Sequence, residues 1–514
     1  MKPDRAQRHH GSPNRKSKIK NRKSSPAPFL TGVIEGFYGQ PWSQAERFEL
    51  FEWLRRFGLN TYLYAPKDDL KHRSHWRERY SANEAARLRA LIRNCRKQKI
   101  RFIYALSPGL DIRYSDKSEL DVLKKKFTQL MALGCRDFAL LFDDIPDQMH
   151  PVDRKRWNSF ALAQSHVTNV LYHWSRRPSI AGRFLFCPTA YCRRMADRQL
   201  GGAGYLETIG RQLVPEIDVL WTGPEIVSRE ITMADLENIG AVLRRRPVLW
   251  DNLHANDYDV RRFYCGPYSG RPAGIKSALN GVLANPNCEF PLNFVPLRTM
   301  AWFVQHRGHW DARRAYLSAM KDWLPRFATI GKSVSFDDLV LLGDCHYLPH
   351  EEGPEAERLY QSGRALLQSG PGARGDEARE FQHLACRLRD CCIRLTELRD
   401  RSLFHALSRR LWELREELDL LLGWIRLRSE NRNARVAWLS DFHLPGTYRG
   451  GLLRRLEQLL TQQPDGTFAP AESAPADVAF PKSARKRRQR KSSPRLARKI
   501  ANRKSTIANL KSKI

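Results

Sequence analysis

Short apolar runs alternate with longer amphipathic segments through residues 31–303. A parallel sheet is covered by helices on both faces, so its strands read as near-continuous apolar runs. Eight such units in succession predict an α/β fold, a closed (β/α)8 TIM barrel. The alternative is a doubly wound open sheet, but no GxGxxG motif follows the first run. The predicted strands lie at 32–36, 61–66, 101–109, 138–144, 183–189, 217–224, 247–252 and 281–287.

Several of the intervening segments carry signals for where a helix starts or ends. Ser43 with Glu46, and Ser81 with Glu84, have the spacing of a capping box, in which each side chain satisfies a backbone amide that the first turn leaves unpaired. Gly58 follows the first amphipathic segment and suits the left-handed residue that ends many helices. These signals predict helices directly after the first and second strands.

From about residue 308 the pattern is helical only. Stretches at 311–327 and 354–368 have helical periodicity, and a Gly/Pro-rich break follows at 370–375. We therefore expect a barrel at 30–305 followed by an all-helical bundle at 306–463. Six leucines at intervals of three or four form a seam that has to pack against another helix, by default within the chain. They are Leu403, Leu407, Leu411, Leu414, Leu418 and Leu421.

Positive charge is concentrated at the two ends of the chain. The formal net charge is +33, and most of it comes from residues 1–30 and 481–514. Both ends are rich in Lys, Arg, Ser and Asn and bury too little apolar surface to fold, so we expect disordered basic tails at 1–29 and 464–514. Weak non-specific binding of nucleic acid or another polyanion is one interpretation of these tails, and a solvated appendage without a selected role is the other.

Composition narrows the class of protein further. The ten cysteines include no CxxC pair, and a metal site at His254 lacks a second histidine cluster, so neither a metal nor another cofactor is expected. The basic N-terminal segment holds no apolar stretch of the length of a secretory signal, and no run of residues is long and apolar enough to cross a bilayer. The expectation is a cytoplasmic protein with reduced thiols and no membrane partner.

An adjacent pair of acids, Asp143 and Asp144, follows the fourth apolar run. Enzymes with a barrel of this kind hold their chemistry at the carboxyl ends of the strands. Neighbouring residues in a strand point to opposite faces, but at a strand end the backbone turns and both can line one pocket. Two carboxyl groups suit glycosidic cleavage, in which one protonates the leaving oxygen and the other stabilises positive charge near the anomeric carbon. Burial and a neighbouring carboxylate raise the pKa of such an acid toward neutrality.

Aromatic and hydrogen-bonding residues close the other runs. They suit a saccharide, whose apolar faces and hydroxyl groups match aromatic walls with Asn, Asp and Lys between them. Packing at the barrel rim is the alternative for each aromatic residue. The segment 250–259, WDNLHANDYD, holds three Asp and two Asn, which indicates a loop that binds something polar. The remaining strand-end groups are 35–38, 67–69, Tyr191, Trp221 and 285–287.

The strand-end motifs, in their order along the chain, resemble the protein O-GlcNAcase family, glycoside hydrolase family 84. The resemblance covers about residues 30–302, and DLVLLGDCHYLPHEEGP at 338–354 resembles the start of the helical stalk in the animal-type enzymes. It implies a (β/α)8 barrel and cleavage of terminal β-linked N-acetylglucosamine with retention, in which the acetamide oxygen of the substrate is the nucleophile. The matching segments are GVIEGFYGQPW, NTYLYAPKDDLKHRSHWRE, FIYALSPGLDI, FALLFDDI, FLFCPTAYC, VLWTGP, VLWDNLHANDYD and ANPNCEF.

The resemblance also implies a role for individual residues. Asp143 would accept the acetamide N–H and stabilise the oxazoline, and Asp144 would be the general acid and then the general base. Tyr191 and Asn252 would hold the acetamide group. The sugar hydroxyls would be bound by the backbone of Gly36 and by Lys67, Asp257 and Asn287, and the cleft would be lined by Trp250 and Tyr258.

The sequence leaves the natural substrate open. The leading hypothesis is a retaining β-N-acetylglucosaminidase that removes O-linked N-acetylglucosamine from Ser or Thr of proteins, and the second is an enzyme of the same chemistry that acts on free glycans such as cell-wall fragments or hyaluronan. A hypothesis of another class is a non-catalytic sugar-binding protein with nucleic-acid-binding tails, against which the intact acid pair argues. The resemblance also implies a homodimer formed through the helical bundle.

Overall fold

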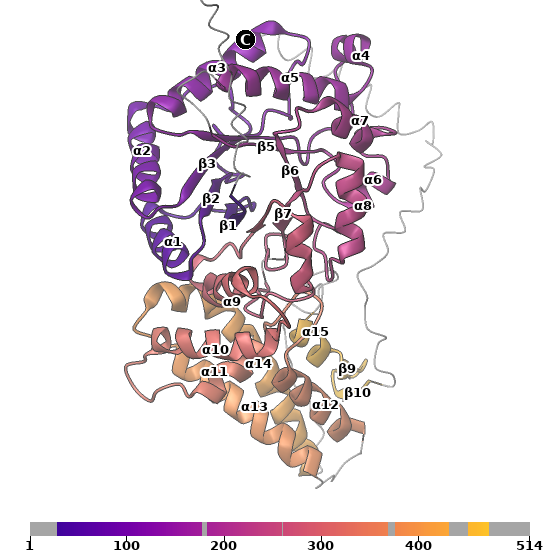
Figure 1. The fold of residues 1–514 in the computed structure, drawn as a ribbon. Coiled ribbons are helices and arrows are strands. Elements are labelled where there is room, and N and C mark those ends of the chain that lie inside the picture. The colour runs from indigo at the N-terminus through magenta and orange to yellow at the C-terminus, as the bar shows by residue number, and fades with distance from the viewer. Residues whose placement is uncertain (1–27, 177–181, 260, 369–375, 431–450, 472–514) are drawn as a thin grey trace, which may run out of the picture.

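Eight parallel strands close into a barrel. The computed structural model describes residues 28–176, 182–259, 261–368, 376–430 and 451–471. Each strand pairs with the next along the chain, and β1 also pairs with β8, so the sheet has no open edge (Figure 1). The predicted (β/α)8 barrel is confirmed, and the open-sheet alternative is excluded. The strands are β1 (Leu30–Glu35), β2 (Thr61–Tyr64), β3 (Arg101–Leu106), β4 (Asp137–Leu141), β5 (Phe184–Cys187), β6 (Asp218–Trp221), β7 (Val248–Asp251) and β8 (Gly281–Ala284).

Helices surround the barrel on its outer side (Figure 1). Both predicted capping boxes are present, one between Ser43 and Glu46 and one between Ser81 and Glu84. Gly58 ends the first helix in the left-handed conformation, with φ of 72°. The helices of this part are α1 (Gln44–Phe57), α2 (Ala82–Lys97), α3 (Lys117–Ala132), α4 (Pro151–Trp157), α5 (Phe160–Ser175), α6 (Arg193–Asp197), α7 (Tyr205–Gln212), α8 (Met233–Leu243), η1 (Ala273–Ala278), η2 (Phe290–Asn293) and α9 (Phe294–Gln305).

Side chains fill both the inside of the barrel and the layer between the strands and the helices. Inside, branched residues of successive strands pack together, among them Ile34, Leu63 and Ile103, so the barrel is a packed core rather than a pore. Outside, aromatic residues join strand to helix, as where Phe127 of α3 stacks on Phe138 of β4 with ring centroids 4.5 Å apart. The strands are buried on both faces, which is why they read as continuous apolar runs.

The chain continues into a helical region that packs against one side of the barrel (Figure 1). The leucine seam lies in α14, and all six leucines are buried within the chain, which confirms the prediction of intramolecular packing. The Gly/Pro break predicted at 370–375 lies outside the described residues. The elements are α10 (Ala312–Trp323), η3 (Leu324–Phe327), α11 (Phe336–Asp344), α12 (Pro354–Gln368), α13 (Asp376–Leu395), α14 (Arg401–Ser429), α15 (Gly451–Glu457), β9 (Leu460–Gln462) and β10 (Phe468–Pro470).

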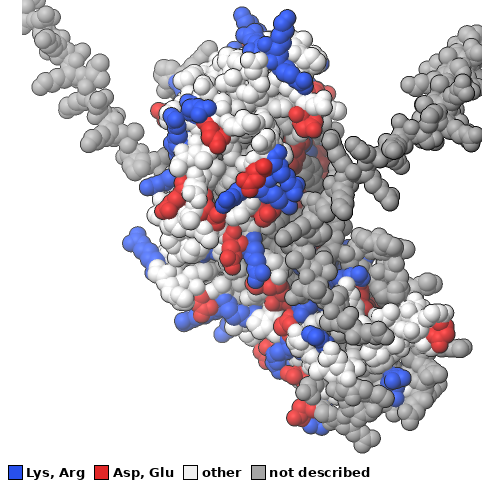
Figure 2. Space-filling view, turned by 90° about the vertical axis from the view of Figure 1, so that its right-hand side faces the viewer, with Lys and Arg blue, Asp and Glu red and all other residues white. Residues whose placement is uncertain are grey.

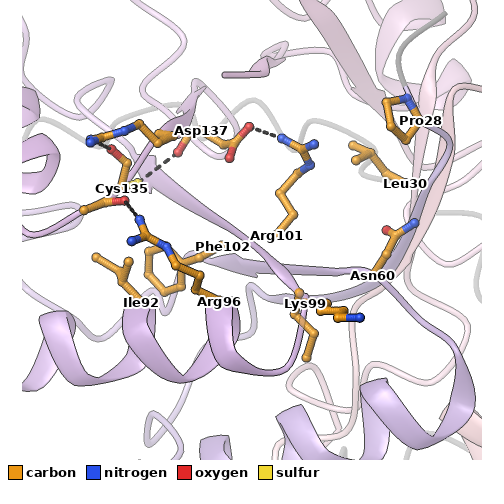
Figure 3. Close-up of a pocket in the computed structure, with 13 residues that line it drawn as sticks. Pro28, Leu30, Asn60, Ile92, Arg96, Lys99, Arg101, Phe102, Cys135 and Asp137 are labelled. Atoms are coloured by element: carbon orange, nitrogen blue, oxygen red, sulfur yellow. Dashed lines mark hydrogen bonds and ion pairs between the residues drawn. The ribbon is translucent and has the colours of Figure 1, made fainter. Parts of the chain in front are cut away.

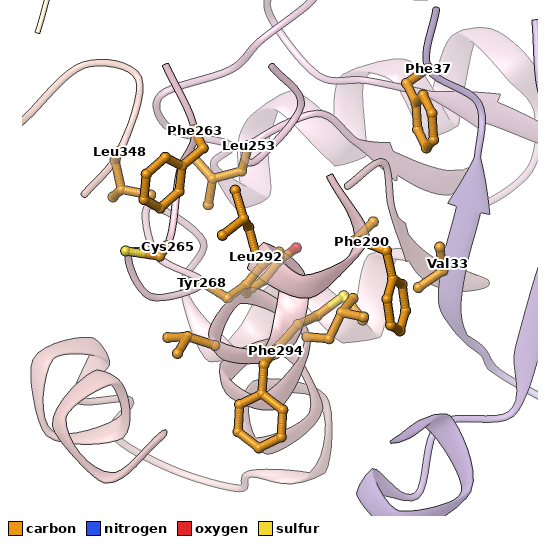
Figure 4. Close-up of a cluster of buried hydrophobic side chains, with 14 of the residues drawn as sticks. Val33, Phe37, Leu253, Phe263, Cys265, Tyr268, Phe290, Leu292, Phe294 and Leu348 are labelled. Carbon is orange, nitrogen blue, oxygen red and sulfur yellow. The ribbon is translucent and has the colours of Figure 1, made fainter. Parts of the chain in front are cut away.

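A shared hydrophobic cluster joins the barrel to the helical region (Figure 4). The ring of Phe263, in the segment after β7, stacks on the ring of His346 with centroids 4.2 Å apart. The backbone amides of Cys265 and Gly266 donate to the carbonyls of His346 and Tyr347 at 2.9 and 2.7 Å. Apolar packing and backbone hydrogen bonds therefore hold the two parts against each other.

The end of the described chain differs from the expected all-helical bundle with a tail from residue 464. β9 and β10 form an antiparallel pair beyond α15. Phe468 is buried, and its carbonyl accepts the indole N–H of Trp424 in α14 at 3.0 Å. Phe468 is one aromatic residue among polar and proline-rich neighbours, so the composition of this stretch did not reveal that it packs. The predicted start of the tail at residue 464 is therefore too early. The basic segments 1–27 and 472–514 lie outside the described residues.

Basic and acidic side chains are interspersed on the face drawn in Figure 2. Lys and Arg alternate there with Asp and Glu instead of forming one field of a single sign. This distribution agrees with the sequence, in which most of the excess positive charge falls at the two ends. Separately, across the described ranges no helix combines the length and the apolar character that crossing a bilayer requires.

A pocket of about 430 Å³ lies at the amino-terminal end of the strands, opposite to the end where chemistry is expected (Figure 3). Its rim is positively charged. Arg96 and Arg136 donate hydrogen bonds to backbone carbonyls close to the end of α3, where a helix leaves carbonyl groups unpaired. Arg101 pairs with Asp137. The positive charge of the pocket is therefore explained by helix capping and ion pairing, and this end of the barrel contributes stability.

Glu35, the last residue of β1, is fully buried in an ionic network. Arg47 of α1 donates to both of its carboxylate oxygens, at 2.6 and 2.8 Å, and the hydroxyl of Tyr62 donates to the same carboxylate. The backbone N–H of Trp42 donates at 3.1 Å. The sequence predicts Glu35 as one of the strand-end residues of the site, but in the structure it holds α1 against the barrel.

Replacing Arg47 with Met removes the positive partner and leaves Glu35 charged and buried. An uncompensated buried charge is costly, so we expect the free energy of unfolding to fall by about 3–5 kcal/mol, measured by urea denaturation with tryptophan fluorescence. Arg55→Met, at an exposed position of the same helix, should change it by less than about 0.5 kcal/mol. Equal effects of the two substitutions would contradict the role given to the pair.

Candidate active site

Asp143 and Asp144 lie beyond the end of β4, where strand geometry has stopped. β4 ends at Leu141, and Asp144 has a left-handed backbone with φ of +50°. This turn breaks the alternation of a strand, in which adjacent side chains point to opposite faces. The hydroxyls of Tyr38 and Tyr191 both donate to the carboxylate of Asp144. Burial raises the pKa of both phenols, and the charges of Asp144 and of the neighbouring Asp143 raise it further.

Asp143 is a buried carboxylate held by a buried lysine. Both Asp143 and Lys67 are 5% exposed, and the Lys67 ammonium donates to Oδ2 of Asp143. Burial by itself raises the pKa of a carboxyl group, but the charge and hydrogen bond of Lys67, with the charge of Arg73, hold the pKa of Asp143 below its usual value. Oδ1 has no hydrogen-bond partner among the described residues. Asp143 is therefore an ionised acceptor with one oxygen left for a ligand.

Asp144 is exposed and is approached by two phenols. The hydroxyl of Tyr38 donates to its Oδ2 and the hydroxyl of Tyr191 to its Oδ1, each at 2.9 Å. Because the pKa of each phenol is raised, both keep their protons at neutral pH and act as donors. The two adjacent aspartates thus have different surroundings, and such a difference is what gives two carboxyl groups in one site different roles.

Gly36 follows β1 and lies against the indole of Trp250 in β7. A Cβ added at Gly36 would lie 2.5 Å from Cζ2 of Trp250, so only glycine lets these two strand ends approach so closely. The Lys67 ammonium lies 5.7 Å from the centroid of the Trp250 ring. The indole, the lysine and the aspartate pair therefore belong to one site.

Asp257 and Tyr258 lie on the segment after β7 and are partly buried. Oδ2 of Asp257 accepts the backbone N–H of Tyr38 at 3.0 Å. Burial, with a contribution from the charge of Asp144, raises the pKa of Asp257 against the opposing effect of that hydrogen bond. The hydroxyl of Tyr258 donates to that of Tyr264 at 3.1 Å. Asp257 thus ties the Tyr38 loop to the opposite side of the site.

Asn252 and Asn287, the two asparagines expected to contact the sugar, form hydrogen bonds with other residues of the protein. Nδ2 of Asn252 donates to the carbonyl of Ile226 at 2.7 Å, and its Oδ1 accepts Nδ2 of Asn285 at 3.0 Å. Asn287 is fully buried, and its amide both donates to the Tyr264 carbonyl and accepts the Tyr264 N–H. Asn287 holds the strand-end loop in place, and its contact with a sugar hydroxyl stays a prediction.

Other polar residues of the segment 250–259 are also used within the protein. Arg271 donates to both oxygens of the buried Asp251, at 2.7 and 2.8 Å, and its charge holds the pKa of Asp251 below the usual value in spite of burial. His254, considered for a metal, lies 3.0 Å from the carbonyl of Gly266. Much of the polar composition of this segment is therefore explained by hydrogen bonds and an ion pair within the protein. Composition alone is weaker evidence for a bound ligand than the sequence suggested.

Two residues of the site carried no role in the sequence-based prediction. Tyr38, on the first strand-end loop, donates to the side chain of Asp144. Arg73 is 7% exposed and donates from Nη2 to the backbone carbonyl of Asp144 at 2.8 Å. The available signal for Arg73 was its place shortly after Lys67 in one strand-end segment, but spacing does not say that this segment folds back to β4.

Comparisons with known proteins agree on one family for this chain. A family model described as beta-N-acetylglucosaminidase matches residues 31–331. The proteins named protein O-GlcNAcase of Rattus norvegicus and Mus musculus are each 50% identical to this chain over 276 residues, which are 54% of this chain and 30% of theirs. The chain therefore spans less than a third of the length of these curated relatives. A solved structure of a Thermobaculum terrenum O-GlcNAc hydrolase mutant is 29% identical with a TM-score of 0.69, over 78% of this chain and 84% of that one.

The matched segment contains all the strand ends at which the site is built. It reaches from β1 through the last barrel helix and into the helical region. It also covers more than half of the chain. On these grounds the chain belongs to the beta-N-acetylglucosaminidase family.

Proposed function

We propose that the chain is a retaining β-N-acetylglucosaminidase that removes O-linked N-acetylglucosamine from Ser or Thr of proteins. The observation that carries the proposal is the free oxygen of a buried, ionised Asp143 directly beside Asp144 at the carboxyl end of the barrel. Substrate-assisted hydrolysis needs an acceptor for the acetamide N–H and a separate acid/base, and no carboxylate attacks the sugar. The relatives named protein O-GlcNAcase support the choice of substrate.

Asp143 accepts the acetamide N–H through its free Oδ1. That bond turns the acetamide carbonyl toward the anomeric carbon, and its oxygen forms a new bond to this carbon as the bond to the leaving oxygen breaks. Positive charge spreads over the resulting oxazoline, and the nearby carboxylate stabilises it. Because the pKa of Asp143 is held low, the carboxylate is charged throughout at neutral pH.

Asp144 gives a proton to the leaving Ser or Thr oxygen and then takes one from the water that opens the oxazoline. Its exposure suits both steps, since the modified protein and the water arrive from solvent. Tyr38 and Tyr191 hold its two oxygens in place. The configuration is retained because the anomeric carbon is inverted twice. The mechanism uses no metal or other cofactor.

The remaining candidate residues surround the sugar ring. Trp250 offers an apolar face, Lys67 a donor and Asp257 an acceptor, the combination that suits a ring with hydroxyl groups at its edge. Tyr191 and Asn252 lie beside the acetamide group in this proposal. The full set of proposed binding residues is Gly36, Lys67, Tyr191, Trp250, Asn252, Asp257, Tyr258 and Asn287.

The proposal also covers the domain division, the oligomeric state, the location and the basic ends of the chain. Residues 30–305 form the catalytic barrel, and residues 306–463 form the stalk-like helical domain, which is followed by the turn into β10. A homodimer through the helical domain is supported by Ile393 and Trp412, large apolar side chains exposed on α13 and α14. A cytoplasmic location and weak polyanion binding by the basic ends rest on the sequence alone.

Asp143→Asn and Asp144→Asn should both slow the hydrolysis of aryl N-acetylglucosaminides. Asp143→Asn loses the charge that stabilises the oxazoline, so kcat should fall about 10²–10³-fold with every leaving group. Asp144→Asn removes the acid, so kcat/KM should fall about 10²–10⁴-fold for a phenyl glycoside and far less for a dinitrophenyl glycoside, whose leaving group needs no proton. Asp147→Asn, exposed on the same loop, is the control. Near-normal turnover in both site variants would end the assignment.

Lys67→Met tests how the charge of Asp143 is maintained. In the proposed mechanism Asp143 has to be ionised, so kcat/KM should fall at low pH as Asp143 becomes protonated. Because the pKa of Asp143 is lowered, this fall, the acid limb of the pH profile, should lie below the usual Asp pKa of about 3.9. Without the Lys67 charge, burial raises this pKa, so the acid limb should move to higher pH. Lys71→Met, in the same segment but paired with Glu84, should keep the wild-type limb. A slower enzyme with an unmoved acid limb would show that Lys67 only binds substrate.

The class of substrate is tested by comparing a glycopeptide that carries O-linked N-acetylglucosamine with chitin-type and hyaluronan oligosaccharides. The proposal predicts a kcat/KM at least about tenfold higher for the glycopeptide. Faster hydrolysis of the oligosaccharides would assign the enzyme to free glycans. Binding of N-acetylglucosamine without turnover of any substrate would leave a sugar-binding protein.

A further inference from the structure

We propose that Arg73 is a positioning residue for Asp144: its guanidinium holds the Asp144 backbone in the left-handed conformation that presents the carboxyl group to the substrate. The inference rests on the proposed function, in which Asp144 is the acid and base. Arg73 touches neither the sugar nor the reacting atoms in this account. It acts by keeping another residue in place.

The backbone conformation of Asp144 is unusual for its position. Apart from glycine, five described residues have positive φ, and four of them, Lys99, Asn158, Gln199 and Arg244, lie at the ends of helices. A left-handed residue there closes the helix and satisfies its last carbonyls. Asp144 alone follows a strand, so helix capping does not explain it. Strained backbone of this kind persists only where the surroundings enforce it.

Arg73 supplies the contact that enforces this conformation. Its Nη2 donates to the Asp144 carbonyl at 2.8 Å, and its guanidinium carbon lies 5.8 Å from the centroid of the Tyr38 ring. The Tyr38 hydroxyl in turn donates to Oδ2 of Asp144. One cation therefore supports Asp144 twice, directly at its backbone and through the ring that binds its side chain.

Apart from the effect of its charge on Asp143, the described structure shows no ionic partner that would account for the placement of Arg73. No ion pair joins Arg73 to a carboxylate among the described residues, and its buried Nη1 finds no hydrogen-bond partner there. Side chains on both sides of Arg73 in the sequence anchor its segment to β3 and to the loop that follows it. His72 bonds to the carbonyl of Ala105 through Nδ1 at 2.8 Å, and the indole of Trp76 donates to Asp111 at 2.8 Å. The anchored segment thus holds the Arg73 guanidinium within hydrogen-bonding distance of the Asp144 carbonyl.

A displaced Asp144 affects the two proposed steps in a way that kinetics can resolve. The proton has to reach the leaving oxygen as the glycosidic bond breaks, and a shift of about 1 Å in a catalytic group costs about 10²-fold in rate. A good leaving group needs no proton. The loss caused by misplacing Asp144 should therefore depend on the leaving group, whereas a general weakening of the fold should not.

The experiment compares kcat/KM of Arg73→Gln for phenyl and dinitrophenyl N-acetylglucosaminides. We expect a loss of about 10- to 100-fold for the phenyl glycoside and a much smaller loss for the dinitrophenyl glycoside. Arg73→Lys keeps a donor and a charge and should recover part of the loss. If Arg73→Gln does not fold, the same comparison of the two glycosides is made with Arg73→Lys.

A double variant connects the effect to Asp144. Arg73→Gln combined with Asp144→Asn should be no slower than Asp144→Asn alone, because Arg73 has nothing left to position. Arg77→Gln is the matched control, since Arg77 lies in the same segment and pairs with Asp111 and Glu119 away from the acid pair. It should leave the ratio of the two kcat/KM values unchanged.

Three outcomes would overturn the inference. Equal losses for both glycosides would mean that Arg73 acts elsewhere, and an acid limb moved at the same time would assign its effect to the charge of Asp143. Additive losses in the double variant would separate Arg73 from Asp144. Normal turnover of Asp144→Asn alone would remove the proposed function itself, and this result is distinct because it does not involve Arg73.

Discussion

Closure of the parallel barrel is the constraint on which the rest of the structure depends. Because β1 pairs with both β2 and β8, the carboxyl ends of all eight strands meet in one ring. The seam is tight, since a Cβ added at Gly281 would lie 2.6 Å from Cβ of Leu30. Residues as distant in sequence as Gly36, Asp143 and Trp250 are neighbours only because the ring closes there.

Within this ring, two adjacent acids have different electrostatic surroundings. Asp143 is removed from water, and its charge is tolerated because the Lys67 ammonium is buried with it. Asp144 stays at the surface, where the hydroxyls of two phenols orient its two carboxylate oxygens. One step along the chain thus separates a group that has to stay ionised from a group that has to exchange a proton in the proposed reaction. The left-handed turn at Asp144 makes that separation possible.

The helical region takes part in holding the rim of the barrel. Arg410 of α14 donates to Glu289 at 2.6 Å, and the other carboxylate oxygen of Glu289 accepts the amide of Asn256 at 2.9 Å. Asn256 accepts the backbone N–H of Cys288 at 2.8 Å. The loops after β7 and β8 are thereby joined to each other and to α14. The walls of the site depend on both parts of the chain, which pack through one continuous cluster of apolar side chains.

The sequence by itself determined the features that depend on residues close together in the chain: the eight buried strands, two capping boxes, the leucine seam and an acid pair at a strand end. A strand buried on both faces requires a run of apolar residues, and the unpaired amides of a helix start require a capping side chain nearby, so both can be predicted from the local sequence. The sugar and the acetamide mechanism came from the resemblance to a family. Only the tertiary structure decided which strand-end groups are open to a ligand. Glu35 is fully buried and bonded to Arg47 within the protein, whereas Asp143 keeps a free oxygen and Arg73 donates to Asp144. The reason is physical: these hydrogen-bond partners lie far apart in sequence and meet only after the strand ends and their loops fold together.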